Sequence, residues 1–149
     1  MRIPPLKAFL FHHTRSVHYD RELLESLTAA ALPLCLILAK KNNAELAALA
    51  GVEISILGSR AMAKVHRDFL DTHGATDVIT FPYGEIIVCA HVARARAPEF
   101  GHSTTHELAL YIIHGLLHLS GFDDLSPPDA QKMDVTQQKI LKLILSKQR

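Results

Sequence analysis

The sequence has few of the features that mark specialised protein classes. It contains seven glycines and seven prolines in 149 residues, and these are scattered rather than clustered. With 48% apolar and 21% charged residues, the composition excludes a collagen-like repeat, a disordered chain and a coiled coil as the main architecture. A domain of this length buries about 68–70% of its unfolded surface, so it needs no disulfide or structural metal to fold. We expect one domain over residues 1–149.

Cysteine and net charge are also scarce. The two cysteines, Cys35 and Cys89, lie far apart in apolar runs, which predicts buried free thiols in a reducing compartment rather than a disulfide. Sixteen Lys and Arg residues against fifteen Asp and Glu leave a formal charge of +1. Since no net field attracts nucleic acid or an anionic membrane, any polyanionic partner must meet a local patch.

Long apolar runs are missing as well. The longest, residues 27–39, has 13 residues and contains Pro33, and it is too short to cross a hydrocarbon core of about 30 Å. The first residues have neither the apolar region nor the cleavage site of a signal peptide. We therefore expect a cytoplasmic protein with no membrane partner.

The pattern of apolar residues predicts an α/β (α+β) domain with a small mixed four-stranded sheet and about five helices. Strands are expected at residues 6–12, 52–57, 77–81 and 85–90, the last two adjacent and antiparallel, with a turn at residues 72–74. Helices are expected from an Asp20 N-cap to about residue 41, at residues 60–70 after a Ser59 cap, at 92–97, through the histidine motif, and at 128–147.

The segment 103–124 carries the most informative motif of the chain, His114, His118, Gly121 and Asp124 in the spacing H-x3-H-x2-G-x2-D. Two histidines four residues apart project from one face of a helix and can converge on one ion. A glycine at Gly121 can end that helix in a left-handed conformation, so that Asp124 returns to the histidines. The spacing predicts a three-ligand catalytic metal site on a core helix, with a position left for water or substrate.

Other interpretations of the two histidines were weighed against this one. Two histidines at helical spacing also occur as hydrogen-bonded core residues, but burying unsatisfied imidazoles costs about 1–3 kcal/mol each. The flanking residues here are strongly apolar: Ile112, Ile113, Leu116, Leu117 and Leu119. Zinc peptidases share the spacing, but they carry a glutamate general base at the position of Gly115. A metallopeptidase therefore stays only as an alternative.

These residues also carry a family resemblance. HGLLHLSGFDD (114–124) resembles the H-G-x-L-H-L-x-G-Y-D-H signature of the YbeY endoribonucleases, the bacterial ribosomal RNA maturation factors. TDVITFP (76–82) is similar to their P-T-D-V-L-S-F-P, GEIIVCA (84–90) to their G-D-I-V-I-S strand, and HELALYIIHG (106–115) to their R-E-L-A-H-L-L-V-H-G. The resemblance covers residues 52–145 in order.

The chain departs from the family pattern in two places. The family's third ligand is usually histidine, and Asp124 stands there, so the ligand set suits iron or manganese besides the expected zinc. The family also places an arginine seven positions before the Asp of its T-D-V motif, where Leu70 stands here. Arg67 lies one helical turn earlier and is not assigned to the site.

Several polar residues near the motif receive no firm role. Glu107, two turns before His114, fits either a partner of a ligand imidazole or a charge at the helix N-terminus. Arg94 and Arg96 are expected on the surface, and the ligand role goes to position 124 rather than Asp123 because of the spacing.

The resemblance implies a function. A YbeY-like protein is expected to be a metal-dependent, single-strand-specific endoribonuclease that hydrolyses phosphodiesters with metal-activated water. Its expected partners are ribosomal RNA and the small ribosomal subunit, in RNA maturation and ribosome quality control. A non-catalytic ribosome assembly factor with a structural metal is the other alternative. The residues assign no general base.

Overall fold

The computed structural model describes residues 5–70 and 77–148, so the turn expected at residues 72–74 lies outside the described residues. Each expected strand is present, and in each strand one bound differs from the expected one by a single residue. The elements are β1 (Lys7–His12), α1 (Arg21–Asn42), η1 (Glu45–Ala48), β2 (Gly51–Leu57), α2 (Ser59–Leu70), β3 (Val78–Phe81), β4 (Glu85–Cys89), α3 (Ala90–Arg96), η2 (Ala97–Phe100), α4 (Thr104–Leu119) and α5 (Pro127–Ser146).

The four strands form one mixed sheet, as expected, and their order in it is β1-β2-β4-β3. β1 and β4 run parallel to β2, with Leu10 opposite Ile54 and Ile54 opposite Ile86, whereas β3 is antiparallel to β4. The connection from β3 to β4 is a tight turn, and Gly84 in it has a φ of 107°. Three neighbouring strands therefore end at the same edge of the sheet.

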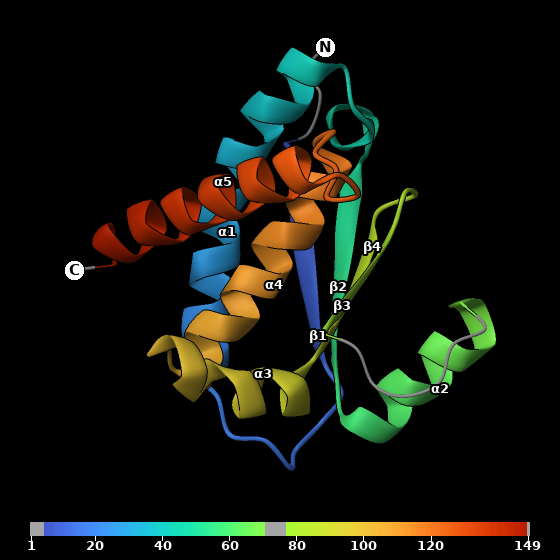
Figure 1. Ribbon diagram of the computed structural model, residues 1–149, viewed down its shortest axis with the longest axis vertical. Coiled ribbons are helices and arrows are strands. Elements are labelled where there is room, and N and C mark those ends of the chain that lie inside the picture. The colour runs from blue at the N-terminus through green and yellow to red at the C-terminus, as the bar shows by residue number, and fades with distance from the viewer. Residues whose placement is uncertain (1–4, 71–76, 149) are drawn as a thin grey trace.

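Helices cover both faces of the sheet (Figure 1). Alternate residues of β4 point to opposite sides, so that Ile86 and Val88 join the main core with α1 and α4, while Ile87 and Cys89 join a smaller cluster with Met62 of α2. α5 packs across α4 and α1. The histidine motif and α2 are thus on opposite faces of the sheet.

α1 is a core helix. Its N-terminus is capped by Asp20, whose carboxylate accepts the Leu23 amide at 3.0 Å, as expected. The whole helix is long and apolar enough to cross a membrane, unlike the 13-residue run within it, and it continues through Pro33. In this fold it packs against β1, α4 and α5. Both cysteines are free and buried, and burial raises the pKa of Cys35 to about 12.

A close contact between a helix and the sheet lies at Gly115 of α4. A Cβ atom there would lie 2.8 Å from Ile86 Cγ2 and 3.0 Å from Thr80 Oγ1. Such distances are shorter than carbon–carbon contact, so only glycine lets α4 approach β3 and β4 this closely. The residue that replaces the peptidase glutamate therefore faces the sheet.

We predict that Gly115→Ala destabilises the protein. Alanine favours a helix by about 1 kcal/mol over glycine, but the overpacking costs about 1–3 kcal/mol and the backbone must shift. The expected result is a net loss of about 1 kcal/mol or more in the free energy of unfolding, measured by urea denaturation followed by circular dichroism.

The same substitution in an Ile86→Ala background is the control. Removing the Ile86 side chain removes the two shortest contacts, so the cost of Gly115→Ala should shrink there. An equal cost in both backgrounds would show that the contact with Ile86 is not the cause.

Candidate metal centre

The two histidines are the partly exposed residues in the otherwise buried second half of α4. α4 begins after Ser103, whose hydroxyl accepts the His106 amide at 3.1 Å, and its second half is buried except at His114 and His118. The side chains of these two residues are 21% and 30% exposed. They lie one turn apart, so both imidazoles face the same solvent-accessible side, as expected.

The end of α4 turns the chain back toward these histidines. Gly121 has a φ of 96°, its amide donates to the His118 carbonyl at 3.1 Å, and the Phe122 amide donates to the Leu117 carbonyl at 2.9 Å. This pair of hydrogen bonds is a Schellman motif, which requires a left-handed residue that glycine adopts without strain. The reversal brings Asp124 over the two imidazoles, as the spacing predicts.

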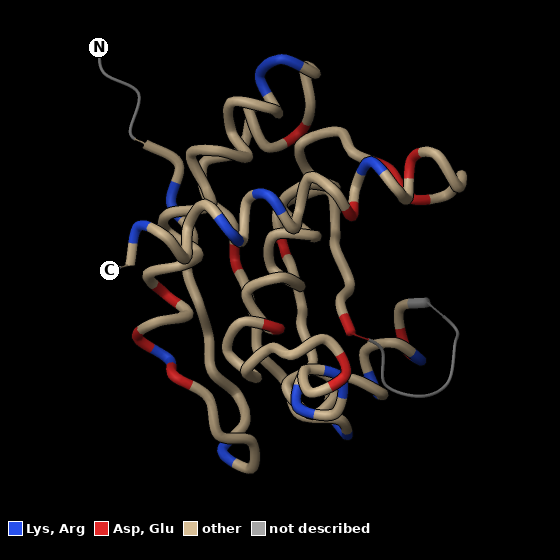
Figure 2. The backbone as a smooth tube through the Cα atoms, turned by 60° about the vertical axis from the view of Figure 1, so that its left-hand side comes forward, with Lys and Arg blue, Asp and Glu red and all other residues tan. Residues whose placement is uncertain are grey.

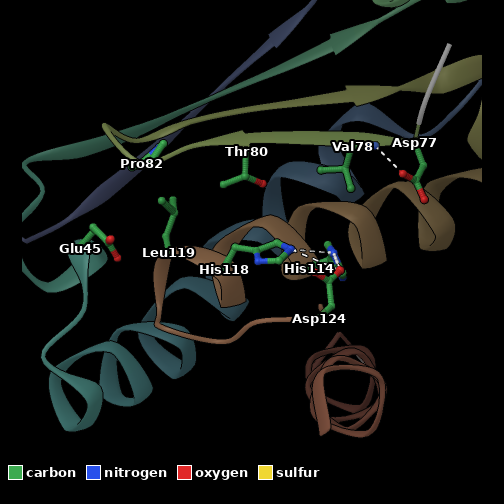
Figure 3. Close-up of a pocket in the computed structure, with 9 residues that line it drawn as sticks. All are labelled: Glu45, Asp77, Val78, Thr80, Pro82, His114, His118, Leu119 and Asp124. Carbon is green, nitrogen blue, oxygen red and sulfur yellow. Dashed lines mark hydrogen bonds and ion pairs between the residues drawn. The ribbon is translucent and has the colours of Figure 1, made fainter. Parts of the chain in front are cut away.

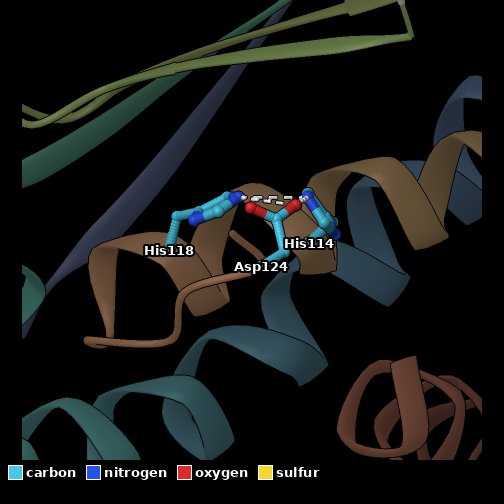
Figure 4. Close-up of side chains that lie close together, drawn as sticks. All are labelled: His114, His118 and Asp124. Carbon is cyan, nitrogen blue, oxygen red and sulfur yellow. Dashed lines mark hydrogen bonds and ion pairs between the residues drawn. The ribbon is translucent and has the colours of Figure 1, made fainter. Parts of the chain in front are cut away.

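Three donor atoms meet at this point (Figure 4). His114 Nε2 is 3.1 Å from His118 Nε2, and Asp124 Oδ2 is 3.3 Å from the first and 3.6 Å from the second. Ligand atoms about 2.05 Å from a tetrahedral zinc ion lie about 3.3 Å from one another. The three atoms therefore have the spacing of one face of a zinc coordination sphere.

The hydrogen bonds of the two Nδ1 atoms determine which nitrogen of each imidazole faces Asp124. His118 Nδ1 lies 3.1 Å from the Phe122 carbonyl oxygen, and His114 Nδ1 lies 2.9 Å from Gln137 Oε1. Because these oxygens accept, both Nδ1 atoms carry the proton, and a neutral imidazole then presents a bare lone pair at Nε2. Two nitrogen lone pairs and a carboxylate oxygen thus converge on one point, where a cation would be held by all three atoms.

A pocket of about 420 Å³ opens above the three residues (Figure 3). Val78 and Thr80 of β3 point into it from the sheet, opposite the histidines, and Pro82 and Leu119 complete its apolar part. Glu45 of η1 and Asp77 line it as well. Among the described residues, no lysine or arginine lines this pocket, so its own side chains give it a negative potential.

The structure shows where the other candidates lie. Arg67 does not line this pocket but a different one, on the α2 side of the sheet. Leu70 is the last residue of α2, and its side chain lies outside the described set. Asp123 accepts the Leu125 amide at 2.7 Å and stabilises the turn before α5. The position opposite the histidines belongs to Asp124, as predicted.

Glu107 does not orient a ligand imidazole. Its carboxylate is 3% exposed and lies 3.0 Å from His102 Nδ1, below the N-terminal half of α4. Burial, and next the Glu107 carboxylate, raise the pKa of Tyr111 one turn further along. The partners of the ligand imidazoles are instead Gln137 and the Phe122 carbonyl. Sequence analysis missed both, because Gln137 comes from α5 and a backbone carbonyl leaves no trace in the sequence.

We predict that Gln137→Leu weakens metal binding. Loss of the acceptor at His114 Nδ1 frees the imidazole to rotate or to change tautomer, and removal of such a partner typically costs about 10–100-fold in metal affinity. The dissociation constant for zinc, measured by competition with a chromophoric chelator, should rise by that factor.

Gln138→Leu is the matched control, since Gln138 is the exposed neighbour of Gln137 on α5. Its zinc affinity should equal that of the wild type. Equal affinities in both variants would remove Gln137 from the centre.

Comparison with known proteins agrees with this geometry. The chain is 34% identical to an endoribonuclease YbeY of Mycolicibacterium smegmatis over 111 residues, covering 62% of each chain. It is 36% identical to that of Mycobacterium marinum over 112 residues, covering 61% of this chain and 63% of the relative. The matches therefore span less than two thirds of the length of these curated relatives.

The fold is shared with a solved structure. The solution structure of TM1509 from Thermotoga maritima superimposes with a TM-score of 0.63 at 24% identity, over 97% of this chain and 92% of that one. The family model described as endoribonuclease YbeY matches residues 13–144, which include the strands β2, β3 and β4, all three converging side chains and most of α5. The chain belongs to the YbeY family.

Proposed function

We propose that this protein is a metal-dependent endoribonuclease that hydrolyses phosphodiester bonds in single-stranded RNA. The biological context that fits is ribosomal RNA maturation and ribosome quality control in the cytoplasm, with ribosomal RNA and the small ribosomal subunit as partners. Support comes from family membership and from the relatives, which carry the name endoribonuclease.

The observation that carries the proposal is the convergence of His114 Nε2, His118 Nε2 and Asp124 Oδ2 within 3.6 Å of one another. Hydrogen bonds at Nδ1 leave both Nε2 lone pairs directed at the carboxylate oxygen. A divalent cation accounts for all three atoms at once. Zinc is the expected ion, and two histidines with one carboxylate also suit iron or manganese.

The pocket chemistry fits a phosphodiester only when its negative charge is offset. Glu45 and Asp124 line it, together with Asp77, which is paired with Arg96 at 3.0 Å, so the lining keeps a net negative charge and the protein alone would repel phosphate. A divalent ion held by the three ligands would supply positive charge, polarise a phosphoryl oxygen and lower the pKa of a coordinated water. Thr80 and Val78, on the opposite wall, confine the substrate between β3 and the histidines.

The open side of the centre favours catalysis over a structural metal. Three protein ligands leave a tetrahedral ion with one free position, whereas structural zinc sites are closed by four. A metallopeptidase would also need a base next to His114, and position 115 packs against Ile86, where a glutamate has no space. This geometry therefore supports a nuclease better than a non-catalytic factor with a structural metal or a metallopeptidase.

We predict that the metal content depends on both histidine and aspartate. Elemental analysis of the purified wild type should find about one divalent ion per chain, and His118→Ala and Asp124→Ala should lose it. Asp123→Ala, the neighbouring carboxylate that stabilises a turn, is the control and should retain the ion. If the wild type stays empty after addition of zinc, manganese or iron, or if Asp124→Ala stays loaded, the three-ligand site is wrong.

We predict that the loaded protein cuts single-stranded RNA. Cleavage of a labelled oligoribonucleotide should stop with chelator, resume on addition of the native metal and fall at least a hundredfold in His118→Ala purified in parallel. The parallel preparation matters because contaminating ribonucleases copurify easily. Equal cleavage by His118→Ala would attribute the activity to a contaminant, and cleavage of an unstructured polypeptide with intact RNA would favour the peptidase.

A further inference from the structure

A second pocket, of about 860 Å³, lies beside α2 and has the opposite character to the metal centre. We call it the basic pocket, and its polar lining includes His13, Ser16, Arg60, Lys64, Arg67 and His91. None of the described residues that line it is acidic. The positive charge of its lining therefore favours an anion as the ligand. His114, His118 and Asp124 do not line this pocket.

Its cations come from one face of one helix. Arg60, Lys64 and Arg67 are spaced by four and three residues, so they form a row along α2, and all three are exposed. The blue positions in Figure 2 mark these and the other Lys and Arg residues of the described chain. Arg67 lies 3.4 Å from Asp68, whereas Arg60 and Lys64 have no ion-pair partner among the described residues. Within the described residues, two positive charges of the row are thus uncompensated.

The floor of the basic pocket is held in place by His91 at the start of α3. Its Nδ1 accepts the Ser59 amide at 3.0 Å, so its proton is on Nε2, which lies 3.1 Å from the Ser16 hydroxyl. The Thr14 hydroxyl in turn lies 3.1 Å from that of Ser16. These bonds join the segments after β1, β2 and β4 into a rigid polar surface below the row of cations.

The topology places this floor at a usual ligand position. β1, β2 and β4 are neighbouring parallel strands, and His13, Gly58 and His91 follow their carboxyl ends. In open α/β sheets, ligands bind in the crevice outside the carboxyl ends of the strands. The row of cations on α2 borders that crevice.

We propose that the basic pocket binds backbone phosphates of the single-stranded RNA substrate, on the face of the sheet opposite the metal centre. This inference rests on the proposed function for the identity of the polyanion. A net charge of +1 and a metal pocket lined by carboxylates give RNA little general attraction, so the affinity must come from a local cluster. The uncompensated Arg60 and Lys64 provide such a cluster.

The test is the salt dependence of RNA binding without cleavage. Anisotropy of a fluorescein-labelled single-stranded oligoribonucleotide is measured in EDTA between 50 and 200 mM salt. Each phosphate contact contributes about 0.7 to the slope of log K against log salt for single strands, so Arg60→Gln/Lys64→Gln should lower the slope by about 1.4. Over this fourfold range the wild type then loses about sevenfold more affinity than the double variant.

Lys139→Gln/Lys142→Gln is the matched control, because it removes two exposed lysines from α5, outside the basic pocket, for the same change in net charge. Its slope should equal that of the wild type. Equal slopes in all three proteins, or equal losses in both double variants, would overturn the proposal, since binding would then follow net charge or other residues. Circular dichroism melting checks that each variant is folded.

Competitors identify the anion. Unlabelled RNA should displace the labelled strand at micromolar concentration, whereas polyglutamate at equal charge should not. Displacement by inorganic phosphate or a mononucleotide, at the concentration at which RNA displaces the labelled strand, would assign the pocket to a small ligand. Displacement by polyglutamate would assign it to an acidic protein. Either result would overturn the proposal that this pocket binds RNA. Since binding is measured in EDTA without cleavage, a protein that binds RNA with the expected slope but does not cut it shows a failure of catalysis, which remains distinct from a failure of this site.

Discussion

The close approach of α4 to the sheet is the constraint on which the site depends. At Gly115 the helix lies against Ile86 and Thr80 with no room for a Cβ atom. This contact sets the separation between the helix that carries His114 and the strand that forms the opposite wall of the pocket. A larger residue would push α4 outward and widen the space between Thr80 and the imidazoles. The same glycine therefore explains a packing contact and the absence of the base that a peptidase would need.

The sheet separates two electrostatic environments. On the α4 side, Asp124, Asp77 and Glu45 line a pocket suited to a divalent cation, and on the α2 side Arg60 and Lys64 border a crevice suited to phosphate. A chain with a net charge of +1 can hold both because the charged side chains that line the two pockets differ in sign. Attraction of a polyanion and the placement of a cation then do not compete for one surface, as they would if the lysine and arginine side chains lined the metal pocket and repelled the ion.

Local features were the most predictable from sequence. The sequence of strands and helices along the chain, the Asp20 cap and the turn at Gly121 depend on residues that are close together in the sequence. From these features the convergence of His114, His118 and Asp124 could be predicted. Contacts between elements that are far apart in the sequence could not be predicted. Gln137 reaches His114 only because α5 crosses α4, and Ser59 is not a cap but the first residue of α2, its amide held by His91 from another strand end. The basic pocket likewise depends on the order of the strands within the sheet, which the spacing of residues along the chain does not reveal.

The carboxylate at position 124 changes the net charge of the three side chains that form the candidate metal centre. A third histidine would leave the ligand set neutral, whereas Asp124 adds a negative charge at the C-terminal end of α4, where the helix dipole is also negative. Both effects strengthen the attraction for a divalent cation. The charge that an anionic ligand donates would also make a bound ion a weaker Lewis acid, so that it would activate water less strongly. With a divalent ion in place, Asp124 would thus favour tighter retention of the ion at some cost in water activation. The orientation of His114 by Gln137, a neutral amide rather than a second carboxylate, keeps further negative charge away from the centre.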